Sequence, residues 1–254
     1  MPEHTGFLTY LLARFPALRQ NAQNVGKTFL LGEQVHYRGI EPIFMSMLVV
    51  LFLVLCAMEV REFYRSLDDA VEPDDTLTLR TFFEAFFGYF YAMAKDVMGP
   101  KRAKRYFPLI GGSAAFIFFS NALGLLPGFT PPTSNLNVTF GCALLVFVSF
   151  NYYGLKENGW SYIKHFAGPA PFLAPLIFPV EVISMCVRPI TLSIRLMLNM
   201  AVDHLVATIF LGMIAILVPV PLFFLAIIVI AVQTLVFCLL AAIYIGLATE
   251  KEHH

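Results

Sequence analysis

The chain has 254 residues, of which 58% are hydrophobic and 13% are charged, whereas a soluble domain carries roughly 25% charged residues. This composition excludes a soluble globular enzyme and indicates an integral membrane protein. Seventeen Lys and Arg residues balance seventeen Asp and Glu residues, so no excess positive charge is available to bind nucleic acid. The four cysteines stand singly in apolar stretches, and we interpret them as small buried residues rather than as a metal or redox site.

The N-terminal residues 1–42 lack the basic, apolar and cleavage segments of a signal peptide. We expect them to form an external segment, followed by a membrane domain over 43–254. A helix needs about 20 apolar residues to cross a bilayer, which places the first span at about 43–60. A longer uncharged stretch is divided by the prolines and polar turn residues of 125–137. This division predicts two spans, at about 108–126 and 136–154.

Two long apolar segments complete the chain, and they are separated at Pro219 and Pro221. They predict spans at about 171–218 and 222–250, each longer than a hydrocarbon core of about 30 Å requires. We therefore expect long, tilted helices packed as a hairpin. Residues 76–98 mix aromatic with charged residues and predict a helix on the membrane surface. The predicted fold is an all-α integral membrane protein with about five transmembrane helices and one surface helix.

The distribution of positive charge predicts the orientation. Residues 59–107 hold eight of the seventeen Lys and Arg residues, whereas the loops at 125–137 and 218–221 hold none. Because cytoplasmic loops carry the excess of Lys and Arg, we expect the first loop and the C-terminus to be cytoplasmic and the N-terminus to lie outside. We find no internal repeat of the kind that many secondary transporters show.

Charged residues within the segment 171–218 are its most unusual feature. Glu181, Arg188 and Arg195 recur every seven residues, and Asn199 follows Arg195 by four, so all four share one helical face. A charge at the bilayer centre costs about 2.5 to 3.5 kcal/mol on insertion scales. This face is therefore expected to point away from lipid.

Several of these residues have a simpler structural interpretation. Arg188 could extend to the inner interface instead of lining a cavity, and Glu181 could be a solvated carboxylate near the inner end of the helix. Arg195 lies too deep for either explanation. Asp203 and His204 are adjacent, so at most one of them lines the same polar path, and His204 suits a proton relay better because histidine titrates near neutral pH.

The last span contains two polar residues, Gln233 and Tyr244, which stand eleven residues apart. Eleven residues make about three helical turns, so both side chains can face one neighbouring helix. Each alone is often a simple contact between membrane helices. Their combination with an intramembrane arginine indicates a functional surface.

The segment ITLSIRLMLNM over residues 190–200, with Gln233, Tyr244 and the segment NLNVT over 135–139, closely resembles subunit a of F-type ATP synthases. The resemblance covers about 106–250 with specific motifs and the first span by pattern only. The N-terminal forty residues and the loop at 61–100 match nothing specific.

The resemblance implies a stator subunit that lies against a ring of c subunits and provides two aqueous half-channels. It places Arg195 at the family's essential arginine, which faces the ring carboxylates and prevents a direct leak between the half-channels. Asn199 and Gln233 match polar positions beside that arginine. Residues that match or could line the ion path are Glu181, His204, Asp203, Tyr244 and Arg188.

One position departs from the family's pattern. Where the helix after Arg195 usually has His or Glu, this chain has Ala226, and the alternatives for the missing relay group are Asp203 and water. The resemblance also implies peripheral-stalk b subunits and the rest of the complex as partners, and H⁺ or Na⁺ as the translocated ion. The modest hydrophobicity of the first span and the charged cytoplasmic loop favour a bacterial inner membrane over the membrane of an organelle.

The sequence lacks the glycine-rich phosphate loop of nucleotide-binding proteins, so we expect a channel component that is not catalytic alone and binds no nucleotide, cofactor or metal. The main alternative is an ion channel or secondary transporter that uses Arg195 as a substrate counter-ion. An intramembrane hydrolase is disfavoured, because neither a nucleophile with a base nor an H-E-x-x-H motif occurs.

Overall fold

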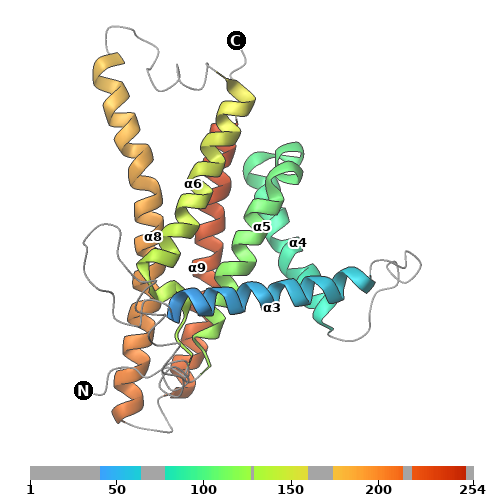
Figure 1. The fold of residues 1–254 in the computed structure, drawn as a ribbon, viewed down its shortest axis with the longest axis vertical. Coiled ribbons are helices and arrows are strands. Elements are labelled where there is room, and N and C mark those ends of the chain that lie inside the picture. Colours follow the sequence, from blue (N-terminus) through green and yellow to red (C-terminus); the bar gives the residue numbers. More distant parts are fainter. Residues whose placement is uncertain (1–40, 64–77, 127–128, 160–173, 214–218, 250–254) are drawn as a thin grey trace, which may run out of the picture.

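The computed structural model describes residues 41–63, 78–126, 129–159, 174–213 and 219–249, and most of these residues are helical (Figure 1). The prediction of an all-α membrane protein is confirmed. The elements are α3 (Glu41–Phe63), α4 (Leu79–Met98), α5 (Pro100–Leu123), the 3₁₀ turn η2 (Pro132–Ser134), α6 (Leu136–Asn158), α8 (Ala174–Met213) and α9 (Pro219–Ala248).

Four of these helices, α3, α5, α6 and α9, are long and apolar enough to cross a membrane by length and composition. The fifth expected span corresponds to α8, a helix of 40 residues that bears the charged side chains discussed above. Helix α5 begins at Pro100 rather than near 108, because the basic residues that follow Pro100 form its first turns. The proposed division into an external segment and a membrane domain stays a prediction, since residues 1–40 lie outside the described part of the chain.

Residues 76–98, which we expect to form a helix on the membrane surface, contain α4, and the position of this helix relative to the membrane stays a prediction. Helix α4 joins α5 through a one-residue turn at Gly99. Gly99 has φ 81° and ψ 162°, a backbone region that is essentially restricted to glycine. The side chain of Thr78 caps the start of α4 by accepting from the N–H of Thr81 at 3.5 Å. One face of α4, including Phe90 and Met98, is buried against α5 and α9, so this helix forms one side of the bundle.

The polar stretch expected to divide α5 from α6 does so through η2. Thr133 donates a hydrogen bond from Oγ1 to Oδ1 of Asn121 at 2.5 Å, which ties the turn to the end of α5. Asn135 then caps α6 by accepting from the N–H of Asn137 at 3.0 Å. These contacts supply polar partners where the chain reverses direction, so α5 and α6 lie antiparallel (Figure 1).

Small residues allow the central helices to approach closely. Lipid tails are as apolar as leucine, so membrane helices associate by packing rather than by the hydrophobic effect, and small side chains favour that packing. Helices α4, α5 and α9 meet through alanines that are almost completely buried: Ala94, Ala103, Ala114, Ala241 and Ala242. Helix α8 joins this core through Leu196, and α6 contacts both α8 and α9.

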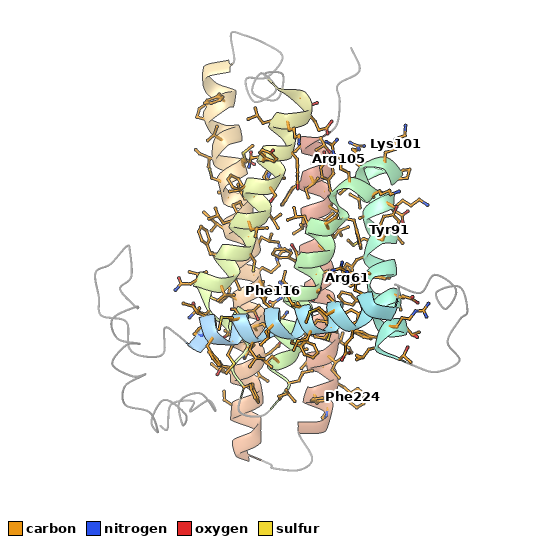
Figure 2. The ribbon with its side chains drawn as sticks, turned by 45° about the vertical axis from the view of Figure 1, so that its right-hand side comes forward. Arg61, Tyr91, Lys101, Arg105, Phe116 and Phe224 are labelled. Carbon is orange, nitrogen blue, oxygen red and sulfur yellow. The ribbon has the colours of Figure 1, made fainter. Side chains whose placement is uncertain are left out.

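Helix α3 crosses the other helices instead of running alongside them (Figures 1 and 2). Its residues Met45 and Val49 are buried, and the helix contacts α5 and η2. Most of its other apolar side chains are exposed in the isolated chain. Because a bilayer has a single normal, α3 and the bundle cannot both stand upright in it, so one of the two is strongly tilted.

Candidate functional site

Helices α8 and α9 contact each other through a pair of amide side chains. Asn199 of α8 donates a hydrogen bond from Nδ2 to Oε1 of Gln233 of α9 at 2.6 Å. Gln233 is only 3% exposed. A buried amide without a hydrogen-bond partner destabilises the fold by the full free-energy cost of its desolvation. The contact therefore satisfies a polar group that the apolar surroundings would otherwise penalise.

A second contact joins the same two helices three turns away. The guanidinium carbon of Arg188 lies 5.1 Å from the ring centroid of Tyr244, within the range of a cation–π interaction. Eleven residues separate Arg188 from Asn199, and eleven separate Gln233 from Tyr244. Both contacts thus belong to one antiparallel register of α8 against α9.

Arg195 lies between these two contacts on the face of α8 that carries Arg188 and Asn199. Its side chain is exposed in the isolated chain. Within the part of the chain that the structure describes, it has neither a hydrogen-bond nor an ion-pair partner. The guanidinium of Arg195 is thus exposed on α8 and accessible to another molecule.

Asp203 follows one turn after Asn199 on α8 and is half-buried. Its Oδ2 atom is buried without a hydrogen-bond partner among the described residues. The backbones of Glu181 and His204 belong to α8, but their side chains lie outside the described part of the structure. Ala226 of α9 is half-buried.

The structure thus brings together four of the predicted residues in two pairs, Asn199 with Gln233 and Arg188 with Tyr244. The sequence pattern predicts that Gln233 and Tyr244 can face one helix, but it does not pair Tyr244 with Arg188. It also misses the contacts of Arg102 and Asn158 with the end of α9. Their partners lie 144 and 90 residues away along the chain, so no local pattern could have revealed them.

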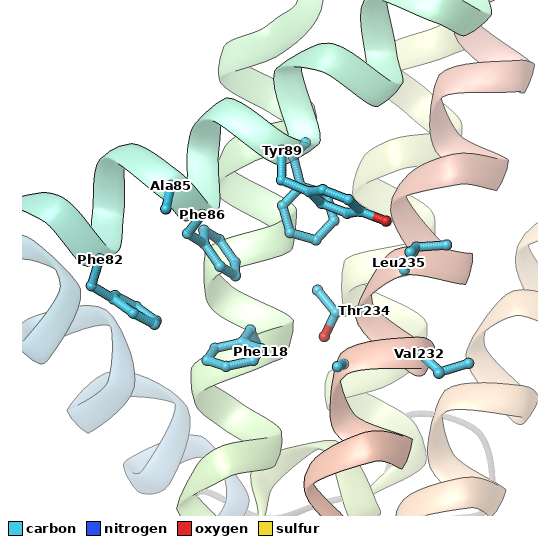
Figure 3. A pocket seen from close by; sticks show the side chains of 10 residues that line it. Phe82, Ala85, Phe86, Tyr89, Phe118, Val232, Thr234 and Leu235 are labelled. Atoms are coloured by element: carbon cyan, nitrogen blue, oxygen red, sulfur yellow. The ribbon is translucent and has the colours of Figure 1, made fainter.

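A separate pocket of about 350 Å³ lies between α4, α5 and α9 (Figure 3). Its lining is apolar apart from the hydroxyls of Tyr89 and Thr234, and it contains no charged residue. Such a lining offers no path for an ion. Among the described residues, no group of three or more His, Cys, Asp or Glu side chains could hold a metal ion.

Comparison with known proteins finds relatives that all belong to one family. The family model described as ATP synthase A chain matches residues 42–246. The chain is 74% identical over its whole length, and over the whole of the relative, to "ATP synthase subunit a" of Sorangium cellulosum. It is 44% identical to "ATP synthase subunit a" of Geobacter sulfurreducens over 175 residues, which are 69% of this chain and 76% of the relative. The chain therefore belongs to the ATP synthase subunit a family, the membrane subunits of the Fo sector.

Proposed function

We propose that this chain is the stator subunit that couples proton translocation to rotation of a c ring. It provides two aqueous half-channels, and Arg195 separates them. Membership in the subunit a family establishes the general role in ATP synthesis and proton transport. The observation that supports the specific role is the position of Arg195, which is exposed and unpartnered among the described residues, between two contacts that order its helix.

A fixed positive charge at this position explains the coupling step. A carboxylate on a passing ring subunit is stabilised in its ionised form when it approaches the guanidinium, because an opposite charge favours the charged state. The carboxyl group therefore releases its proton beside Arg195 and binds another after it has moved on. Arginine suits this role better than lysine, because arginine does not lose its proton in proteins.

The polar residues around Arg195 have supporting roles in this proposal. The Asn199–Gln233 pair and the Arg188–Tyr244 pair hold α8 against α9, so that Arg195 keeps its place on the surface. Glu181 and His204 line the ion path along α8. Asp203, whose Oδ2 atom has no described partner, or water supplies the relay that Ala226 cannot provide.

The proposal also assigns partners and location. The c ring lies against the Arg195 face, b subunits form the peripheral stalk, and the translocated ion is H⁺, with Na⁺ as the alternative. The subunit resides in a bacterial inner membrane, with its N-terminus outside and its C-terminus in the cytoplasm. Catalysis takes place elsewhere in the complex, and this subunit contributes the ion path.

The proposal is tested by ATP-driven proton pumping in inverted membrane vesicles, followed with a pH-sensitive dye. We expect Arg195→Ala to reduce pumping to the background of uncoupled vesicles while the c ring and the b subunits still co-purify. Arg61→Ala is the matched control, since Arg61 is an exposed arginine at the end of α3, and it should pump normally. Normal pumping by Arg195→Ala, or a wild type with which no ring co-purifies, would favour a channel or transporter instead.

A further inference from the structure

Side chains from two other helices cap the C-terminal end of α9. The last four carbonyl groups of a helix have no partner within that helix. Arg102 of α5 donates from Nη1 to the carbonyl of Gly246 at 3.2 Å, and Asn158 of α6 donates from Nδ2 to the carbonyl of Ala248 at 3.1 Å. Thr249 donates from its N–H and Oγ1 to the carbonyl of Ile245 at 3.0 and 2.7 Å. We call Arg102 and Asn158 the cap pair.

The cap pair connects α9 to every helix of the α4–α5–α6 group. Arg102 also donates from Nε to the carbonyl of Met98 at 2.8 Å, so one guanidinium joins the ends of α4 and α9. Its charge is favourable there, because helix C-termini carry partial negative charge. Arg105 of α5 pairs with Glu157 of α6 nearby, and Figure 2 shows Arg105 at this end of the bundle.

The capped end and the residues that face α8 belong to one uninterrupted helix, α9. No Gly or Pro occurs between Gln233 and Gly246, so nothing in this stretch favours a kink. Thirteen residues separate the two positions, a distance of about 20 Å along a regular helix. A shift of the capped end by one residue would rotate the helix by about 100° and would move Gln233 and Tyr244 away from their partners together.

We infer that Arg102 and Asn158 are positioning residues that set the register of α9 against α8. They hold Gln233 opposite Asn199 and Tyr244 opposite Arg188 through their hydrogen bonds to the C-terminal end of α9. The effect on proton transport rests on the function proposed above, whereas the effect on register does not. Lys104 provides the matched control, because it is an exposed cation two residues from Arg102 and has no partner among the described residues.

Disulfide cross-linking in membranes measures the register directly. The full chain carries Asn199→Cys and Gln233→Cys after its four native cysteines have been replaced by alanine, and the oxidant is copper phenanthroline. We expect Arg102→Gln to slow cross-linking by about tenfold, the factor that corresponds to losing a hydrogen bond from a charged donor. Arg102→Lys should restore part of the rate because it keeps a cationic donor, and Lys104→Gln should leave the rate unchanged.

Asn158→Ala keeps the test decisive if Arg102→Gln fails to accumulate in the membrane. It removes one donor at the end of α6 and should also slow cross-linking. The inference is overturned if Asn158→Ala and every Arg102 variant that accumulates cross-link at the parent rate, or if Lys104→Gln slows the reaction as much as they do.

Proton pumping by the same substitutions in the otherwise native chain separates this inference from the proposed function. We expect pumping to fall in Arg102→Gln while the complex still assembles, and to recover partly in Arg102→Lys. If cross-linking slows but pumping is normal, the cap pair does set the register, and the coupling role given to the α8–α9 contacts is wrong.

Discussion

At the scale of single residues, the polar groups of α8 follow the helical period. The spacing of Arg188, Arg195 and Asn199 in the sequence is sufficient to place them on one face of a helix, and two of the three contact α9. The pairing itself could not be predicted, because it depends on the register of two helices. Unlike Arg188 and Asn199, Arg195 has no partner among the described residues, so its charge is available to another molecule.

The Asn199–Gln233 hydrogen bond gives a prediction at this scale. Asn199→Leu leaves the buried amide of Gln233 without its partner, and we expect a loss of about 1 to 2 kcal/mol in the free energy of unfolding. The double variant Asn199→Leu with Gln233→Leu should lose less, because no unpaired amide is then buried. Titration of the purified chain with SDS in mixed micelles measures the free energy of unfolding of both variants.

A matched control for that pair is Thr191→Val. Thr191 is exposed, and among the described residues its hydroxyl bonds only the carbonyl of Val187, within its own helix. Its replacement should therefore change stability by less than about 0.5 kcal/mol. A single variant as stable as the double variant would show that the amide pair is not coupled.

At the scale of elements, most helices follow from the distribution of charge and proline. The expected segment 171–218 contains α8, and the polar stretch at 125–137 contains η2 between two helices. Helix α5 begins at Pro100, before the span expected at about 108–126, because a run of basic residues marks a membrane boundary without ending a helix. The packing of α4 against α9 was not predictable either, since it depends on a turn made by one residue, Gly99.

Substitution of Gly99, in a turn, and of Gly88, inside a helix, by alanine should have opposite effects on stability. Neither has an atom within 4 Å of an added Cβ, so only the backbone decides the outcome. Gly99→Ala forces alanine into a conformation restricted to glycine and should cost about 1 to 3 kcal/mol of stability. Gly88→Ala, within helix α4, should instead add about 0.5 to 1 kcal/mol.

Thermal unfolding of the two glycine variants in one detergent gives this comparison. The melting temperature should fall for Gly99→Ala and rise for Gly88→Ala. Equal shifts for both variants would mean that the turn conformation of Gly99 does not contribute to stability.

At the scale of the whole molecule, the local sequence pattern determines which segments are apolar but not how they cross. Helix α3 has the composition of an ordinary span, yet it crosses the bundle (Figure 1). Only contacts between segments distant in the chain decide that arrangement. The orientation of the bundle in the membrane, in contrast, is a prediction that rests on the positive charge of the loops.

That orientation predicts which ends of the α5–α6 hairpin are accessible from each side of the membrane. Lys101 and Asn137 are exposed at opposite ends of the hairpin. In a chain without native cysteines, Lys101→Cys should react with an impermeant thiol reagent only from the cytoplasmic side, and Asn137→Cys only from outside. The reverse pattern would contradict the predicted topology.

The central claim is that Arg195 keeps two half-channels apart, and passive proton flux through membranes stripped of the catalytic sector tests it most directly. With Arg195→Ala, the barrier between the half-channels loses its fixed charge, so we predict passive flux at least equal to that of the wild type, although ATP-driven pumping by intact complexes is lost. Arg61→Ala should leave both the passive flux and the ATP-driven pumping unchanged. Loss of passive flux in a fully assembled Arg195→Ala complex would contradict the claim, because Arg195 would then conduct protons rather than separate the two paths.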